Sequence, residues 1–358
     1  MENRLILAIN PGSTSTKIAV YDNIKSVFVK SLKHSTDELK KFGSIQDRLI
    51  FTKQIIIREL EEANISLNNV EIVIGRGGLL KPIPSGVYEV NDLMRSDLSS
   101  YKYGEHASNL GALIAYEIAK DINGARALIA DPVVVDELQD EARLTGLPQF
   151  ERRSVFHALN HKATGRMHAK SIGMQYDQLN LIIAHLGGGI SIGAHLKGRV
   201  IDVNQALDGE GPLSPERSGT LPAGDLIKAC FSGKYDYDTL KRLITGEGGF
   251  VAYMGTNDAY QVEMKAKGGD EKAILLQNTL GYQVSKYIGS MATVLKGEVD
   301  AILLTGGIAH NKTLMDYITR RVRFIAPVFI YPGEDEMRAL AQNAYRVMMN
   351  EEEVKLYN

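Results

Sequence analysis

The sequence predicts an α/β fold in two related halves, and three observations support this. Short apolar runs of strand character alternate with amphipathic segments at helical spacing, which is typical of α/β proteins. The opening pattern of the chain recurs near its middle, between residues 180 and 199. The length of 358 residues fits about two domains.

The first half contains the clearest sequence of elements. Residues 5–9 and 17–21 are apolar strands, and the intervening residues 10–16 have the composition of a tight turn. Residues 45–63 have helical periodicity, with the apolar positions Ile45, Leu49, Ile50, Ile56, Ile57 and Leu60. Further along we expect a strand at 71–74, a helix at 111–120 and a strand at 127–130 that ends at Asp131-Pro132.

The second half repeats the strand, turn and strand of the first. Without gaps, residues 180–199 align with residues 4–23 and match Leu5 with Leu181, Ala8 with Ala184, Gly12 with Gly188, and Ser15 with Ser191. Such internal similarity near mid-chain indicates a duplicated domain. We therefore expect a first domain at 1–165, a second at 166–332, and a last helical segment within 333–358 that returns to the first domain.

Composition excludes several classes of protein. Lys and Arg total 41 and Asp and Glu total 43, so the near-neutral chain gives no support for non-specific nucleic-acid binding. No apolar run approaches the ~20 residues that span a bilayer, and the first residues lack the features of a signal peptide. Cys230 is the single cysteine, so an intrachain disulfide and a cysteine-based zinc cluster are both excluded. We expect a cytoplasmic protein.

The two matched turns are suited to phosphate binding. Gly, Ser and Thr in a tight turn between strands leave backbone N–H groups free and allow an anion to approach closely. Lys17 follows the first turn and can neutralise a phosphate, while residues 187–189 are three consecutive glycines in the second turn. One such turn alone is more often only a turn, but two in matched positions can hold one phosphate chain.

A third glycine-rich segment follows the buried run at 301–304. Here Gly306 and Gly307 end a strand and allow close approach to a flat ligand such as adenosine, although a plain strand-to-helix turn has the same composition. Other nucleotide and hydrolase signatures are absent from the sequence: the P-loop, the dinucleotide fingerprint, H-E-x-x-H, the G-x-S-x-G elbow and the protein-kinase set.

Together these motifs resemble the superfamily of acetate and sugar kinases, heat-shock cognate proteins and actin, specifically its short-chain acyl kinase branch, the acetokinase family. The likeness runs in order over nearly the whole chain and is carried by residues 10–17, 154–161, 185–191, 214–219, 305–308 and 332–336. The phosphate motifs are similar across the superfamily. The histidine motif at 154–161 and the arginine motif at 214–219 narrow the likeness to acyl kinases.

The resemblance implies a duplicated actin-like (ribonuclease H-like) fold with a nucleotide cleft between its domains. It also implies ATP/ADP and Mg²⁺ as cofactors and direct, reversible phosphorylation of a short-chain carboxylic acid, with butyrate the first choice. Acetate, propionate or a branched-chain acid is the alternative substrate, and a homo-oligomer, at least a dimer, is the expected assembly. The nucleotide-binding residues that it implies are Asn10, Gly12, Ser13, Ser15, Lys17, His185, Gly187, Gly188, Gly189, Gly306, Gly307 and Asn311.

Four residues are the candidates for catalysis. Phosphorylating a carboxylate requires positioning and charge neutralisation rather than a general base, so Arg and His are the expected groups. Arg217 would stabilise the transferring phosphoryl group through its planar fork, and His157 would donate a hydrogen bond to it. Arg76 stands where acetate kinases have histidine, and because Val73 replaces their carboxylate-binding arginine, Arg76 is the proposed substitute. Asp131 would orient the Mg²⁺ shell.

The remaining candidates concern the metal and the acyl pocket. Metal ligands are expected among Asp131, Asp335 and Glu336, with Glu334 also in the acidic run, although acids at a helix start are equally good dipole partners. His161 and His106 are weaker site candidates. Residues Leu79, Leu80, Ile83, Pro84 and Val87 follow Arg76 and are either the acyl pocket or ordinary core.

Two other kinds of protein remain open from the residues. A non-catalytic nucleotide sensor or scaffold can have the same fold, because fold does not determine function. A sugar kinase would need a carboxylate base for a hydroxyl substrate, and Asp131 could serve as one.

Overall fold

The structure is a computed structural model, and it describes residues 4–12, 15–33 and 44–358. The chain divides into two compact units: unit 1 comprises Met1–Val135 with Asp335–Asn358, and unit 2 comprises Asp136–Glu334. Along the sequence, the division lies between Val135 and Asp136, about 30 residues before the predicted boundary near 165. Residue 165 itself lies inside helix α6 (Ala158–Ser171). The predicted domain limits remain a prediction, and each unit is described here by itself.

The sheet of unit 1 has the order β12-β5-β6-β4-β1-β2-β3. Strands β1, β2 and β3 form an antiparallel meander, and β1, β4 and β6 are parallel to one another. The bounds are β1 Leu5–Pro11, β2 Ser15–Asp22, β3 Lys25–Lys33, β4 Val70–Arg76, β5 Val87–Glu89, β6 Arg126–Ala130 and β12 Val354–Lys355. The predicted strands at 5–9, 17–21, 71–74 and 127–130 are confirmed.

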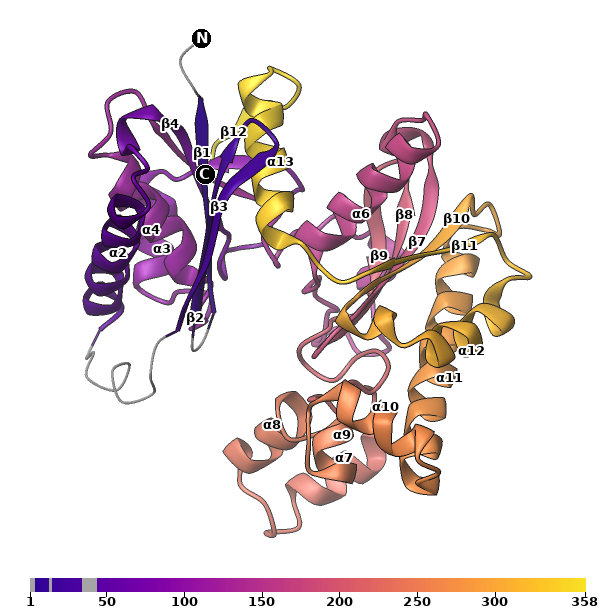
Figure 1. The fold of residues 1–358 in the computed structure, drawn as a ribbon. Coiled ribbons are helices and arrows are strands. Elements are labelled where there is room, and N and C mark those ends of the chain that lie inside the picture. Colours follow the sequence, from indigo (N-terminus) through magenta and orange to yellow (C-terminus); the bar gives the residue numbers. More distant parts are fainter. Residues whose placement is uncertain (1–3, 13–14, 34–43) are drawn as a thin grey trace. The chain divides into compact units, whose positions relative to one another are not determined.

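Helices cover both faces of this sheet (Figure 1). On one face, α4 (Asn109–Ala119) packs against β1, β4 and β6, with α2 (Ile45–Glu62) and α3 (Asp92–Ser99) against α4. On the other face lies α13 (Glu336–Met348), which packs against β1, β2, β4 and β6. The last long helix of the chain thus packs on the sheet that contains the first strands.

The sheet of unit 2 repeats the central order of unit 1, as β11-β10-β7-β8-β9. Strands β7, β8 and β9 form an antiparallel meander, while β7, β10 and β11 are parallel. The bounds are β7 Asn180–Leu186, β8 Ile190–Leu196, β9 Arg199–Val203, β10 Ala301–Gly306 and β11 Val328–Pro332. Because β7-β8 stands in the place of β1-β2, the predicted duplication is confirmed at the level of topology.

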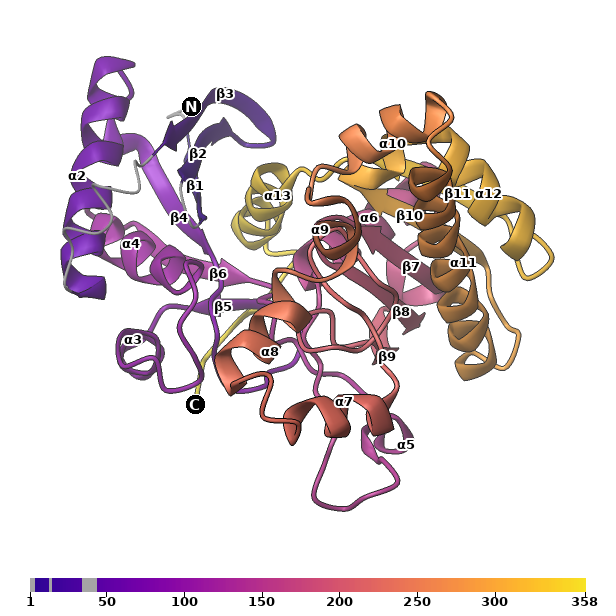
Figure 2. The ribbon, with the colours of Figure 1, turned by 90° about the horizontal axis from the view of Figure 1, so that it is seen from below.

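In unit 2 the helix α6 lies on one face of the sheet and α11 on the other (Figure 2). The helix α12 packs on α11. The helices α7 to α10 form an insertion after β9, and these helices were not predicted from the sequence. The further bounds are α5 Asp140–Arg143, α7 Ala223–Cys230, α8 Tyr237–Thr245, α9 Gly249–Met254, α10 Ala259–Lys267, α11 Glu271–Val294 and α12 Lys312–Val322. Of the helices that the structure describes, none combines the length and hydrophobicity needed to cross a membrane.

Two glycines allow α4 to approach the end of β4. A Cβ added at Gly75 would lie 2.2 Å from the carbonyl oxygen of Gly111, and one added at Gly111 would lie 2.2 Å from the carbonyl oxygen of Arg76. The helix start also supports the chain after β4, since Asn109 accepts a 2.8 Å hydrogen bond from the backbone of Leu79. The position of Arg76 therefore depends on backbone-to-backbone packing of α4 on β4.

We expect Gly111→Ala to destabilise the protein by about 2–3 kcal/mol, because the added methyl overlaps backbone atoms that cannot move independently. The matched control is Gly289→Ala in α11, where an added Cβ meets no described atom within 4 Å. That change should stabilise by about 1 kcal/mol through helix propensity. Urea denaturation measures both, and equal effects of the two changes would contradict the close packing of α4.

Candidate active site

A backbone hydrogen bond connects the end of β1 to the start of β2. The amide of Gly12 donates it to the carbonyl of Ser15 at 2.6 Å, and the Lys17 side chain lies exposed two residues further on. The predicted residue Ser13 lies outside the described residues. Gly12 follows β1 directly, Ser15 and Lys17 belong to β2, and their phosphate contacts remain a prediction.

Three predicted site residues of unit 1 contact one another. Arg76, at the end of β4, pairs with both carboxylate oxygens of Glu336, each at 3.2 Å. Asn10, at the end of β1, donates a 2.5 Å hydrogen bond to Glu336 and accepts one from Arg76 at 3.4 Å. The sheet order β4-β1 places Arg76 beside Asn10, and α13 supplies Glu336. The result is a half-buried guanidinium–carboxylate–amide cluster.

Asp131 lies in a different setting. It is buried, its backbone φ is +39°, and its Oδ1 accepts hydrogen bonds from the Ser85 hydroxyl at 2.7 Å and the Gly86 amide at 2.9 Å. These bonds fix the turn before β5. The roles proposed for Asp131 in catalysis and in metal binding remain predictions, and the structure gives this carboxylate a clear structural task.

The two other predicted metal ligands differ in their surroundings. Asp335 caps α13, because its carboxylate accepts a 3.0 Å hydrogen bond from the Arg338 amide, and its side chain is exposed. Glu336 instead joins Asn10 and Arg76. Within residues 4–12, 15–33 and 44–358, no group of three or more His, Cys, Asp or Glu side chains forms a metal cage.

The second glycine turn, residues 187–189, packs against the predicted arginine loop. The Ser214 hydroxyl donates a 2.6 Å hydrogen bond to the Gly188 carbonyl and accepts one from the Arg217 amide at 3.1 Å. A Cβ at Gly189 would lie 1.8 Å from Nη1 of Arg217. A side chain at position 189 would therefore displace the Arg217 guanidinium from its present place, so the turn and the arginine are in close contact.

Arg217 is a half-buried cation with few partners. Its Nη1 donates to the carbonyl of Ala206, and its Nε is buried without a hydrogen-bond partner in the described part of the chain. Burial lowers the pKa of Arg217, and the charges of Glu216 and Asp208 only partly oppose this. A guanidinium in this state stabilises an anion strongly, because a bound oxyanion would supply both the missing partner and the missing countercharge.

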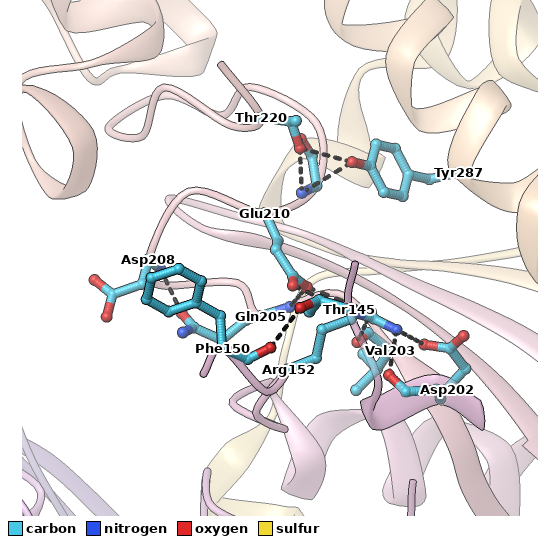
Figure 3. Close-up of polar contacts among 12 residues, drawn as sticks. Thr145, Phe150, Arg152, Asp202, Val203, Gln205, Asp208, Glu210, Thr220 and Tyr287 are labelled. Atoms are coloured by element: carbon cyan, nitrogen blue, oxygen red, sulfur yellow. Dashed lines mark hydrogen bonds and ion pairs between the residues drawn. The ribbon is translucent and has the colours of Figure 1, made fainter. Parts of the chain in front are cut away.

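The carbonyl that accepts the hydrogen bond of Arg217 belongs to Ala206, and the loop around Ala206 is held by Arg152. Arg152 was not among the residues predicted from the sequence, and Figure 3 shows its contacts. Arg152 donates to Asp202 at 2.9 Å, to the Val203 carbonyl at 3.0 Å and to Glu210 at 3.2 Å. Glu210 in turn accepts a 2.8 Å bond from the Gln205 amide. Burial acts to lower the pKa of Arg152, but Glu210 and Asp202 outweigh it and raise that pKa.

Two predicted histidines stack beside the second turn. The rings of His157 and His185 have centroids 3.9 Å apart and planes 17° apart. Nδ1 of His185 lies 2.8 Å from Oδ1 of Asn160, and its Nε2 lies 3.3 Å from the carboxylate of Glu334. The amide oxygen of Asn160 can only accept a hydrogen bond, so His185 donates to it from Nδ1. Protonation of His185 at Nε2 as well would complete an ion pair with Glu334.

The two glycines of the predicted adenosine segment differ, since Gly306 has a positive φ and is buried whereas Gly307 is exposed. Gly306 has φ +92° and exchanges backbone hydrogen bonds with Gly333 at 3.1 and 2.9 Å, while an added Cβ would overlap the Leu186 backbone. Gly307 is exposed. Asn311 caps α12 through the Leu314 amide and donates to Gln277, so its side chain serves the fold, and its nucleotide contact remains a prediction.

The weaker candidates have separate outcomes. His106 forms a local 2.7 Å contact with Ser108 in unit 1, whereas His161 lies fully buried in unit 2 between Ser191 and His195. His195 and Tyr176, which continue the contacts of His161, were not predicted from the sequence.

A sequence signal for this group did exist. His157 and His161 are spaced i, i+4, which places them on one face of a helix, and Ser191 and His195 lie on the same face of a strand. Of the acyl-pocket candidates, the ones that belong to the buried core are Leu80, Ile83 and Val87.

Comparison with known proteins gives a consistent result. The profile of the Acetokinase family matches residues 141–343. The curated Butyrate kinase 2 of Clostridium acetobutylicum is 54% identical over 352 residues, covering 98% of this chain and 99% of that protein, and Butyrate kinase 1 of the same organism is 53% identical with the same coverage. The crystal structure of Porphyromonas gingivalis acetate kinase has a TM-score of 0.77 at 20% identity and covers 96% of this chain and 100% of that one. A propionate kinase from Francisella tularensis has a TM-score of 0.72 at 19% identity, with 95% and 98% covered. The predicted fold class and family are confirmed.

We expect Arg152→Lys to lower kcat at least tenfold, because an ammonium cannot make the divergent bonds that fix the loop accepting Arg217. Hydrogen exchange should show faster exchange across residues 203–211. The matched control is Arg143→Lys, since Arg143 binds Asp136 through two nitrogens and contacts the Leu138 carbonyl instead. Wild-type exchange in this loop in the Arg152 variant would contradict the bracing role.

Proposed function

The chain belongs to the acetokinase family, and from this premise we propose that it phosphorylates butyrate with ATP, giving butyryl phosphate and ADP in a reversible reaction. The high identity to curated butyrate kinases supports butyrate over acetate or propionate, since the acetate and propionate kinases compared above share far less sequence with this chain. A sugar kinase or a non-catalytic sensor receives no such support.

The chemistry is an in-line transfer between two anions. A carboxylate oxygen of butyrate attacks the γ-phosphorus, a P–O bond forms there, and the bond from that phosphorus to the bridging oxygen of ADP breaks. No proton has to be removed from the nucleophile, because butyrate is ionised at neutral pH. The protein must therefore position the two anions and neutralise the charge on the phosphoryl oxygens.

The single observation that carries this proposal is the state of Arg217. Its guanidinium is half-buried beside the second glycine turn, and among the described residues its buried Nε has no hydrogen-bond partner and no carboxylate forms an ion pair with it. Such a group is costly in the absence of ligand and strongly favourable beside a phosphoryl group. We assign it the stabilisation of the transferring phosphoryl group, with His157 donating a further hydrogen bond.

The cluster of Asn10, Arg76 and Glu336 supports the second part of the site. Carboxylate and amide oxygens are ligands that fit Mg²⁺, so Glu336 and Asn10 would hold the ion directly or through water, with Asp335 and Asp131 the less suited candidates. When bound, Mg²⁺ would neutralise charge on the nucleotide phosphates. Arg76 already makes a two-point contact with a carboxylate, and we propose that it also orients the carboxylate of butyrate.

The remaining assignments follow the family. We propose that the residues of the two glycine turns bind the phosphates of ATP/ADP, and that Gly306 and Gly307 face its adenosine. We also propose that the protein acts in the cytoplasm, where ATP and Mg²⁺ are available, and that it assembles as a homo-oligomer.

The direct test is an acyl-phosphate assay with hydroxylamine trapping. Purified protein, ATP and Mg²⁺ are incubated separately with acetate, propionate, butyrate and isobutyrate. Each missing methylene should cost ~1–3 kcal/mol of discrimination, so butyrate should give the highest kcat/KM, with measurable overlap to propionate. A maximum at acetate would contradict the assigned substrate, and ATP binding without turnover of any acid would contradict the assigned activity.

We expect Arg217→Ala to lower kcat by about 10³-fold and to change the Kd of ATP much less, because the lost interaction is strongest in the transition state. The control is Arg320→Ala, which removes an exposed arginine of α12 and should leave both quantities unchanged. Steady-state kinetics and calorimetric titration measure them. An unchanged kcat in the Arg217 variant would remove Arg217 from the reaction.

A further inference from the structure

A continuous chain of polar contacts runs from His157 into the interior of unit 2. Nδ1 of His157 lies 2.9 Å from the Ser191 hydroxyl, and the same hydroxyl lies 2.9 Å from Nε2 of His161. Nδ1 of His161 lies 3.1 Å from Nε2 of His195, and Nδ1 of His195 lies 2.6 Å from the Tyr176 hydroxyl. Every link is within hydrogen-bond distance, so a single chain joins a site residue to a tyrosine near Gly165.

The inner members of this chain are fully buried and uncharged. Ser191, His161 and His195 are each 0% exposed. Burial lowers the pKa of His161 well below its usual value, the charge at His185 adds to this, and a hydrogen bond to the Ser191 backbone opposes it. Burial likewise lowers the pKa of His195, with His161 and Lys162 acting in the same direction. The nearby Lys162 is itself paired with Glu137 at 2.7 Å.

A neutral imidazole has one donor and one acceptor, so two senses give every proton of the chain an acceptor. In one sense Tyr176 donates to His195, His195 to His161, His161 to Ser191, and Ser191 to Nδ1 of His157. In the other sense every proton is on the opposite side and the phenol is the acceptor. A third arrangement, in which His157 and His161 both donate to the Ser191 hydroxyl, would leave the proton of that buried hydroxyl with neither nitrogen as acceptor, which is costly. A phenol O–H is a strong donor, so the Tyr176 end favours the first sense.

We propose that Ser191, His161, His195 and Tyr176 are positioning residues that fix the tautomer of His157, with its Nδ1 as an acceptor and its proton on Nε2. This inference rests on the proposed function, in which His157 donates to the phosphoryl group. With the opposite tautomer, Nε2 would present a lone pair to an anion, and the contact would be repulsive. The chain thus secures a donor on a neutral imidazole, which stacks on the ring of His185.

The test reads the tautomer directly by NMR of ring ¹⁵N-labelled histidine in the full-length protein. In the wild type, Nδ1 of His157 should have a pyridine-type shift and Nε2 a pyrrole-type shift. Tyr176→Phe removes one hydroxyl, and His161→Leu removes the central link. Either variant should produce a second His157 population with the proton on Nδ1, and both should lower kcat several-fold with little change in KM.

The matched control is His161→Gln. A glutamine amide can accept from His195 and donate to Ser191, so this variant should keep the wild-type tautomer and most of kcat. Because Tyr176→Phe is a small change at a half-buried position, the test does not depend on the buried leucine variant folding.

Unaltered His157 nitrogen shifts in both Tyr176→Phe and His161→Leu would overturn the inference, as would an Nδ1-protonated His157 in the wild type. These outcomes are separate from failure of the proposed function, because the shifts are read without substrate. Failure of the function would appear as no acyl phosphate formed by the wild-type protein.

Discussion

The partly desolvated guanidinium of Arg217 is the constraint on which the architecture of unit 2 near the second glycine turn depends. A cation partly removed from water without an ion pair must be held by its surroundings, or it would move to solvent. Gly189 leaves space for the Arg217 side chain, and Ser214 connects the Arg217 backbone to the glycine turn. Arg152 and Glu210 fix the loop whose carbonyl accepts the hydrogen bond from the guanidinium. The structural network thus keeps a charge available for an anion.

The two units solve a related problem with different residues. Each sheet contains an antiparallel pair of consecutive strands, β1 with β2 and β7 with β8, at the same place in the same strand order. In unit 1 the neighbouring arginine, Arg76, is neutralised by Glu336, whereas in unit 2 Arg217 has no ion-pair partner among the described residues. Duplication therefore supplied the scaffold, and the side chains placed on it gave the halves unequal electrostatics.

Much of the fold could be predicted from the sequence, because the buried strands at 5–9 and 181–184 are strong local signals and their repetition implies the duplication. The proximity of Asn10 and Arg76 follows from parallel strands that end at one edge of a sheet. The sequence alone could not show which acidic residue of the run 334–336 contacts them. Arg152, His195 and Tyr176 were missed, because their partners are distant in sequence and are determined by packing. Asn311 shows that a motif residue can also serve the fold, since its side chain caps α12.

The acidic run at 334–336 also limits how the chain can be re-engineered. Glu334 ends unit 2 and pairs with His185, Asp335 caps α13, and Glu336 in unit 1 pairs with Arg76. Three consecutive side chains thus have three separate tasks, and Asp335 stands between a residue that contacts His185 within unit 2 and one that pairs with Arg76 within unit 1. Chimeras that exchange halves between homologues should therefore keep all three residues together on one parental segment.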